Sequence, residues 1–183
     1  MNSPHEIQTP SAWVARWAPL VQAGGTVLDL ASGFGRHARH FAALGHTVLA
    51  VDRDAEALAT LRGVERIEAQ VADLEGAPWP FVPAQFAAVV VSNYLHRPLL
   101  PQLVESLDVG GVLIYETFMV GNERYGKPSN PVFLLRPDEL LEAVRGHLAV
   151  VAFEQGTVQT PKPAVVQRIC AVRTPIPQAI QPR

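Results

Sequence analysis

The stretch that decides the fold reads Val27-Leu28-Asp29-Leu30-Ala31-Ser32-Gly33-Phe34-Gly35-Arg36. A short apolar run enters a loop of small residues with glycines at alternate positions, and an amphipathic stretch over 36–44 closes at Gly45. Glycine permits positive φ angles and lets a ligand approach the backbone closely, and the N-terminus of a helix presents free N–H groups. The pattern therefore predicts a strand, a binding loop and a helix in succession.

Strand-like and helix-like segments alternate along the rest of the chain. The apolar runs that predict strands cover 26–30, 46–52, 66–71, 86–91, 111–116, 148–153 and 164–172. Helical spacing of apolar residues covers 36–44, 54–61, 98–107 and 137–144. This alternation predicts an α/β fold with a doubly wound, seven-stranded and mostly parallel sheet that has one antiparallel strand near the C-terminus. Ligands bind such sheets beyond the carboxyl ends of the strands.

The composition predicts one soluble domain. The chain has 183 residues, 48% of them hydrophobic, and 15 Lys and Arg against 17 Asp and Glu give a net charge of −2. This balance argues against nucleic-acid and anionic-membrane partners, and the polar first residues lack the pattern of a signal peptide. We expect a cytoplasmic protein with a single domain over 1–173, an N-terminal helical cap over 1–22 and an extended tail over 174–183.

Cysteine and histidine usage argues against a metal site. Cys170 is the one cysteine, which excludes a disulfide framework and a multi-cysteine metal site. The six histidines follow no metal-ligand spacing, so no metal is expected. Because Cys170 lies in a late apolar run, we expect it to be a buried core thiol rather than a nucleophile.

Three acids follow or end three successive predicted strands, and all would face one crevice. They are Asp29, Asp52 and Asp73. Asp52 lies 21 residues after Ala31, and an acid about 20 residues beyond a glycine loop is where a ribose hydroxyl pair is bound. The chain has no G-x-x-x-x-G-K-[ST], which excludes a P-loop, and it departs from the dinucleotide pattern G-x-G-x-x-G at its first and third glycines.

The segment from Asp29 to Gly35 resembles the first motif, acid-x-G-x-G-x-G, of the class I S-adenosylmethionine-dependent methyltransferases, with Ala31 in place of the first glycine. That replacement requires that position 31 not need a conformation open only to glycine. The resemblance covers about 26–172, and the proportions of the chain resemble the small bacterial methyltransferases of the tellurite and thiopurine type. It implies S-adenosylmethionine as the cofactor.

The resemblance also implies roles for residues of the glycine loop. Gly33 and Gly35, with Ala31 and Ser32 beside them, would lie against the amino-acid part of the cofactor. Asp29 would help to position its ammonium group. The alternative for Asp29, and equally for Asp73, is that the side chain only caps a loop.

Further residues are implied to hold the nucleoside. Asp52 would accept hydrogen bonds from both ribose hydroxyls, and Arg53 would cover the adenine ring. Asp73 would accept from the adenine amino group, while the backbone of Leu74 would meet a ring nitrogen. Ser92, at the end of the fourth strand, would form a wall of the methyl-donor pocket.

Candidate catalytic residues follow the fourth predicted strand. His96 has the intrinsic pKa of a general base, and Tyr94 could stack on an acceptor or form a hydrogen bond with it. The alternative for His96 is a structural histidine that packs against Pro98 at the start of a helix.

A long loop over 116–131 supplies the candidate substrate residues. Loops of this length over the carboxyl edge of a sheet are commonly lids or binding loops. Its cations, together with Arg97, could hold an anionic acceptor, which makes the candidates Arg97, Arg124, Tyr125 and Lys127. The alternative is a solvated loop whose cations pair with Glu116 and Glu123.

Two helical segments carry further aromatic and charged residues. Trp13 and Trp17 share one helix face, which favours core packing over a role in capping the cofactor crevice. The basic residues of the first helix after the glycine loop are expected to form its solvated face; they are Arg36, His37, Arg39 and His40.

Together the residues and the resemblance predict methyl transfer from S-adenosylmethionine to a small-molecule acceptor by in-line displacement, without a metal. The alternatives are an oxidoreductase that binds NAD(P) and, in a different class, a non-catalytic partner subunit that binds the cofactor. The acceptor, the acceptor atom and the oligomeric state stay open.

Overall fold

The computed structural model describes residues 9–174; the first eight residues and most of the predicted tail lie outside this range. The α-helices are α1 (Ala12–Trp17), α2 (Arg36–Ala43), α3 (Ala55–Ala59), α4 (Leu100–Glu105) and α5 (Glu139–Val144). The short 3-10 helices are η1 (Ala18–Leu20), η2 (Arg97–Leu99), η3 (Asn122–Arg124) and η4 (Pro131–Phe133). The strands are β1 (Thr26–Leu30), β2 (Thr47–Asp52), β3 (Ile67–Val71), β4 (Phe86–Ser92), β5 (Leu107–Phe118), β6 (Ala149–Val158) and β7 (Ala164–Val172).

All seven strands form one sheet in the order β3-β2-β1-β4-β5-β7-β6. The pairs of β1 with β2 and β4, of β2 with β3, and of β4 with β5 are parallel. β7 runs antiparallel to both of its neighbours, β5 and β6. The predicted fold class, including the antiparallel strand, is confirmed. The order reverses direction at β1 and β4, which is the switch point where a crevice opens.

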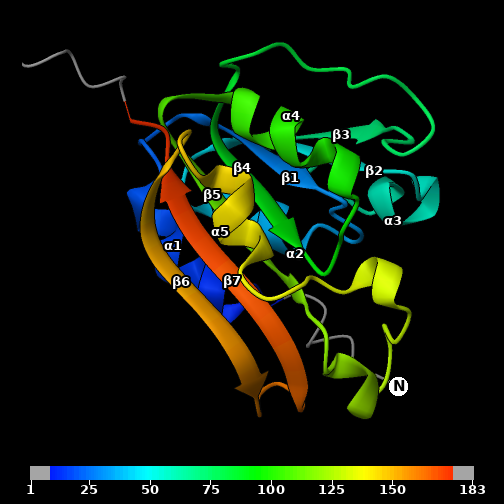
Figure 1. Ribbon diagram of the computed structural model, residues 1–183. Helices are drawn as coiled ribbons and strands as arrows, with labels where there is room; N and C mark the ends of the chain where they lie inside the picture. The colour runs from blue at the N-terminus through cyan, green and yellow to red at the C-terminus, as the bar shows by residue number, and fades with distance from the viewer. Residues whose placement is uncertain (1–8, 175–183) are drawn as a thin grey trace, which may run out of the picture.

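Helices cover both faces of the sheet, and Figure 1 shows α4 and α5 in front of the strands with α1 behind them. Alternate residues of each strand point to opposite faces. Val89 and Leu113 therefore pack in the cluster that includes residues of α4 and α5, while Val90 and Ile114 pack in the cluster that includes residues of α1, α2 and α3. Burial on both faces explains why the central strands are continuously apolar.

The glycine loop after β1 is held in left-handed backbone conformations. Ala31, Gly33 and Gly35 have φ angles of 53°, 52° and 72°. A Cβ atom at Gly35 would lie 2.6 Å from the Leu61 side chain, so glycine is also needed there for packing. Position 31 lies in the left-handed region, which is not open only to glycine: Ala31 adopts it, at a cost of about 1–2 kcal/mol for an L-residue.

Within residues 9–174, no helix is both long enough and apolar enough to span a membrane. The N-terminal cap predicted over 1–22 corresponds, as far as it is described, to α1 and η1, which pack on the sheet. Trp13 is 3% exposed, and its indole Nε1–H donates to the Ile169 carbonyl at 3.2 Å. Trp13 and Trp17 make an edge-to-face contact with ring centroids 5.7 Å apart. Core packing of the α1 tryptophans is therefore what the structure shows.

Candidate functional site

A cavity of 360 Å³ lies along the carboxyl ends of the five parallel strands. Each strand end or the loop that follows it contributes to the wall, in the order Asp73 after β3, Asp52 at β2, Ala31 after β1, Asn93 after β4 and Thr117 at β5. Neighbouring strands lie about 4.8 Å apart, so five strand ends extend over roughly 19 Å. The cavity is therefore an elongated one that borders all five parallel strand ends.

Asp52 joins the end of β2 to the glycine loop. Its Oδ2 accepts a hydrogen bond from the Gly33 N–H at 2.8 Å, and its Oδ1 accepts one from the Asp54 N–H at 2.9 Å. These two bonds fix the carboxylate in one orientation at the cavity wall. Each carboxylate oxygen can accept a second hydrogen bond, so Asp52 can still receive a pair of hydroxyl groups.

The end of the cavity beside β3 is acidic. Arg53, Asp73, Leu74 and Glu75 line it. The Oδ1 of Asp73 accepts from the N–H groups of Glu75 and Gly76 at 3.1 and 3.2 Å, which is the loop-capping geometry of the alternative interpretation. Asp73 therefore caps its loop and also lines the cavity, and the two interpretations do not exclude each other.

The glycine loop has a hydroxyl without a partner, a backbone position open to close approach and a neighbouring cation. The buried hydroxyl of Ser32 has no hydrogen-bond partner among the described residues. A Cβ atom at Gly33 would meet nothing within 4 Å, so the backbone there is open to a close approach. The Arg36 guanidinium reaches across to the Ser92 hydroxyl at 3.0 Å. Arg36 is thus directed toward the end of β4 rather than to the solvated face that the sequence predicts.

Asp29 lies behind the glycine loop and does not line the cavity. It is 1% exposed, and its Oδ2 accepts from the Ala38 N–H of α2 at 2.8 Å. Burial raises its pKa to about 7, against the opposing effects of the Ala38 hydrogen bond and the nearby Arg36. The capping interpretation describes this geometry, and the role of Asp29 in positioning an ammonium group, directly or through water, stays a prediction.

His37 is also corrected, because it is buried rather than solvated. It is 3% exposed, its Nε2 accepts from the Ser11 N–H at 3.2 Å, and its Nδ1 lies 4.0 Å from Asp29. Burial lowers its pKa to about 3. Its ring thus lies between Ser11, at the start of α1, and Asp29 of β1. His40 is half-buried, and burial lowers its pKa as well.

Of the two catalytic candidates, Tyr94 lines the cavity and His96 does not. Burial, followed by the neighbouring Glu75, raises the pKa of the Tyr94 phenol. Its backbone is positioned by buried Tyr115, whose hydroxyl donates to the Tyr94 carbonyl at 2.8 Å. His96 instead directly precedes η2. The structure thus favours the structural alternative for His96.

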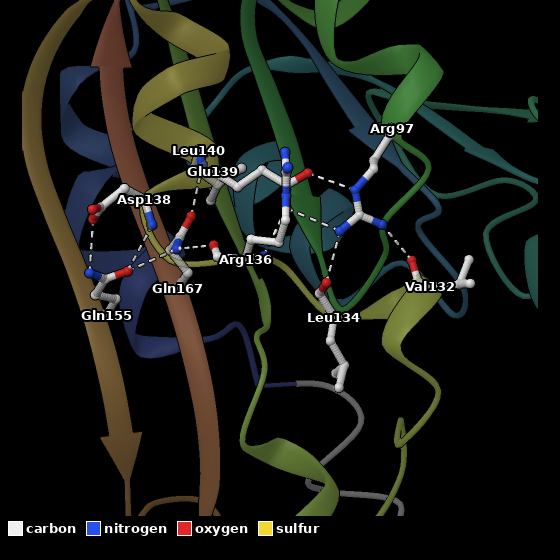
Figure 2. Close-up of polar contacts among 9 residues, drawn as sticks. All are labelled: Arg97, Val132, Leu134, Arg136, Asp138, Glu139, Leu140, Gln155 and Gln167. Atoms are coloured by element: carbon white, nitrogen blue, oxygen red, sulfur yellow. Dashed lines mark hydrogen bonds and ion pairs between the residues drawn. The ribbon is translucent and has the colours of Figure 1, made fainter.

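Arg97 is engaged by other protein groups (Figure 2). Its guanidinium donates to both carboxylate oxygens of Glu139, at 2.6 and 3.0 Å. It also donates to the carbonyls of Val132 and Leu134, at 2.7 and 2.8 Å. Four of its five N–H donors are used in this way. The prediction that Arg97 binds an anionic acceptor is therefore corrected: Arg97 fixes the 131–135 segment.

The remaining predicted substrate residues stand outside the cavity. Arg124, Tyr125 and Lys127 are exposed and do not line it. Within residues 9–174 neither cation makes an ion pair, because Glu116 pairs with Arg168 at 3.1 Å and Glu123 accepts from the Gly121 N–H. Both the anion-binding interpretation and its ion-paired alternative are thus unsupported. Cys170 is fully buried, and burial raises its pKa to about 11, as suits a core thiol.

Known proteins share this architecture. Residues 27–109 match the family model described as a methyltransferase domain. The match covers less than half of the chain, and over those residues the chain is similar to methyltransferase domains. Among solved structures, TehB from Haemophilus influenzae is 18% identical with a TM-score of 0.74, over 90% of this chain and 63% of TehB. The chain therefore spans less than two thirds of the length of TehB.

Two further solved methyltransferases show the same fold. An S-adenosylmethionine-dependent methyltransferase from Methanosarcina mazei is 14% identical, with a TM-score of 0.69 over 91% of this chain and 99% of that one. Geranyl diphosphate C-methyltransferase from Streptomyces coelicolor, solved with Mg²⁺, geranyl diphosphate and S-adenosyl-L-homocysteine, is 19% identical, with a TM-score of 0.63 over 87% of this chain and 80% of that one. No curated protein sequence matches this chain significantly.

Several cavity residues lie outside the sequence-based prediction. They are Ala72, Glu75, Asn93, Leu95, Thr117, Phe118, Pro128 and Phe133. Four of the eight, Glu75, Asn93, Leu95 and Pro128, directly follow a residue that the pattern identified, and that adjacency was the available signal. Phe133 had no such signal, because its place at the cavity depends on the hydrogen bonds that Arg97 donates to the carbonyls on either side of it.

Proposed function

We propose that this chain is a methyltransferase that binds S-adenosylmethionine across the ends of β3, β2, β1 and β4. It transfers the methyl group to a small molecule at the end of β5. One observation carries the proposal: a continuous cavity runs from the Asp52 and Asp73 carboxylates to Thr117. A nucleoside site and an acceptor site in one space are what a direct transfer requires.

Asp52 and its neighbours would hold the nucleoside. The Asp52 carboxylate is already oriented by two backbone N–H groups, so it can accept from the ribose hydroxyls without further ordering. Asp73 and the Leu74 backbone line the adjoining wall, where the adenine edge would lie. Arg53 lines the same end of the cavity and would cover the ring.

Arg36 and Ser32 would hold the amino-acid part. The cofactor carries a carboxylate, and Arg36 is the cation that the structure directs from the glycine loop to the end of β4. The unpartnered Ser32 hydroxyl and the open backbone at Gly33 supply a donor and room for close approach. These three features fit a zwitterionic amino acid, whose charges need matched partners when they are desolvated.

Bound S-adenosylmethionine supplies a methyl carbon that a lone pair of the acceptor attacks as the carbon–sulfur bond breaks and its electrons pass to sulfur. The chain has to hold the acceptor on this line and exclude water. Tyr94 keeps its proton because its pKa is raised, so it serves as a hydrogen-bond donor and a wall rather than as a base. Asn93 and Thr117 are the other polar residues that line the cavity near the ends of β4 and β5. Neither is a base, so an acceptor proton would leave to solvent.

The test combines binding with transfer. Calorimetric titration with S-adenosylmethionine, S-adenosylhomocysteine and NAD is followed by incubation with methyl-labelled cofactor and a panel of small acceptors. We expect both adenosyl compounds to bind, NAD to be silent, and label to appear in at least one acceptor. Binding of NAD alone would establish the oxidoreductase alternative instead. Cofactor binding without transfer to any acceptor, together with a co-purifying protein, would establish the partner-subunit alternative.

A further inference from the structure

We propose that the acceptor is an uncharged, predominantly apolar molecule, received at the β5 end of the cavity against Phe118, Pro128 and Phe133. This inference rests on the proposed methyl transfer and specifies its substrate class. All three residues line the cavity, with Phe118 at the end of β5, and Leu95 contributes a fourth apolar residue to the wall. The polar groups nearby, Asn93 and Thr117, carry no charge.

The apolar wall is accessible rather than sealed in the core. Phe133 is 48% exposed although it is a large aromatic residue that lines a cavity. The residues that follow it, Leu134 and Leu135, are 2% and 0% exposed and anchor the segment in the core. An aromatic ring held partly open beside a cavity buries additional apolar surface when a ligand arrives, at about 25 cal/mol per Å².

The charges of the cavity disfavour an anion. Asp52, Asp73 and Glu75 line it, and Arg53 is the cation that lines it with them. The cations that the sequence suggested for an anionic acceptor are placed elsewhere, because Arg97 is bonded to Glu139 and Arg124 is exposed outside the cavity. At the β5 end, an anionic acceptor would find no cation among the described side chains that line the cavity.

Hydrogen bonds hold the loop that carries the apolar wall in place before any ligand binds. Arg97 fixes the carbonyls on either side of Phe133 (Figure 2). Buried Asn122 donates to the Pro128 carbonyl at 3.0 Å and accepts from the Val165 N–H at 3.1 Å. The wall is therefore pre-organised, which favours a small rigid acceptor over one that requires the loop to rearrange.

The experiment uses a pair of nearly isosteric probes that differ in charge, 2-naphthamide and 2-naphthoate. Each is titrated calorimetrically into the full chain saturated with S-adenosylhomocysteine, after the affinity for S-adenosylhomocysteine has been measured alone. We expect 2-naphthamide to bind about tenfold more tightly than 2-naphthoate, a difference of about 1.4 kcal/mol. Phe133→Ala should weaken 2-naphthamide binding about fivefold or more while it leaves S-adenosylhomocysteine affinity unchanged.

Val132→Ala is the matched control, because Val132 is 63% exposed, adjacent in sequence and absent from the cavity wall. It should leave both affinities unchanged. Equal or tighter binding of 2-naphthoate, no binding of either probe, or an unaltered 2-naphthamide affinity in Phe133→Ala would overturn the inference while the proposed function stands. Failure of S-adenosylhomocysteine to bind would overturn the proposed function itself, and the substrate class with it.

Discussion

The Oδ2 atom of Asp52 lies 2.8 Å from the backbone nitrogen of Gly33 and accepts its hydrogen bond. One carboxylate therefore joins the end of β2 to the glycine loop after β1 and also lines the cavity. The residue that would recognise the ribose is thus also the residue that orders the loop beside it.

Asp52→Ala should weaken S-adenosylhomocysteine binding by two hydrogen bonds to a charged group, each worth about 1.5–3 kcal/mol. Because the Gly33 bond is lost as well, the thermal midpoint of the cofactor-free protein should also fall. Asp52→Asn keeps one acceptor oxygen and should show a smaller loss in both measurements. Calorimetry and thermal unfolding of the two variants check this, and an unchanged affinity in Asp52→Ala would remove the ribose from this position.

Arg36→Met should weaken binding of the amino-acid part of the cofactor and leave binding of the adenosine part unchanged. Loss of a charged hydrogen bond to the carboxylate should weaken S-adenosylhomocysteine binding by about 1.5–3 kcal/mol, or roughly ten- to a hundredfold. Adenosine lacks the amino-acid part, so its affinity should stay at the wild-type value. An equal loss for both ligands would show that Arg36 acts through the fold rather than on the carboxylate.

Ala31→Gly should stabilise the protein. Ala31 has a φ of 53°, which is costly for an L-residue and free of strain for glycine. We expect the free energy of unfolding to rise by up to about 1 kcal/mol after the entropic cost of glycine is included. Ala43→Gly in α2, where the backbone is helical, should instead lower it by about 0.5–1 kcal/mol. Urea unfolding of the two variants measures both changes in the free energy of unfolding, the expected rise and the expected fall.

Arg97→Met should loosen the 131–135 segment. It leaves Glu139, which is 4% exposed, without its closest cationic partner. Burial would raise the pKa of Glu139, but hydrogen bonds from Arg97 and Arg136 outweigh it and lower the pKa. The variant should lose about 1.5–3 kcal/mol of stability, and amide exchange at Leu134 and Leu135 should accelerate. Adding Glu139→Gln should restore part of the loss, and Arg97→Lys should not match the arginine because it lacks the planar fork.

Asp29→Asn should gain stability over the wild type as the pH rises from about 4 to about 7. The pKa of Asp29 is raised to about 7 from an ordinary value of 3.8, so the folded state holds the proton more tightly than the unfolded chain does. The wild type is therefore most stable below the ordinary pKa. Its free energy of unfolding declines by at most about 1.4 kcal/mol for each pH unit until the folded-state pKa is passed.

Asparagine does not titrate, so the difference between the two unfolding free energies, measured in urea at several pH values, should grow through this window and then level off. The lowered pKa of His37 destabilises both proteins as the pH falls below its ordinary value. A difference that does not vary with pH would contradict the burial-raised pKa of Asp29.

Local sequence patterns were sufficient to predict the sheet and the acidic edge of the cavity. Strand and helix periodicities are local, and a parallel sheet places residues such as Asp52 and Asp73 at one edge whatever the rest of the chain does. The surroundings of the charged and aromatic residues depended instead on long-range packing. Arg97 was assigned to a substrate because nothing in its neighbourhood reveals Glu139, which lies 42 positions later in the chain.

The same reason explains His37 and Phe133. His37 lies on the polar side of a short helical pattern, and only the tertiary fold, which brings Ser11 and Asp29 to its ring, buries it. Phe133 lies in an irregular loop, whose path depends on hydrogen bonds from distant residues rather than on a periodic pattern. Local sequence thus set where the chain turns and pairs, whereas long-range contacts selected which side chains were left to meet a ligand.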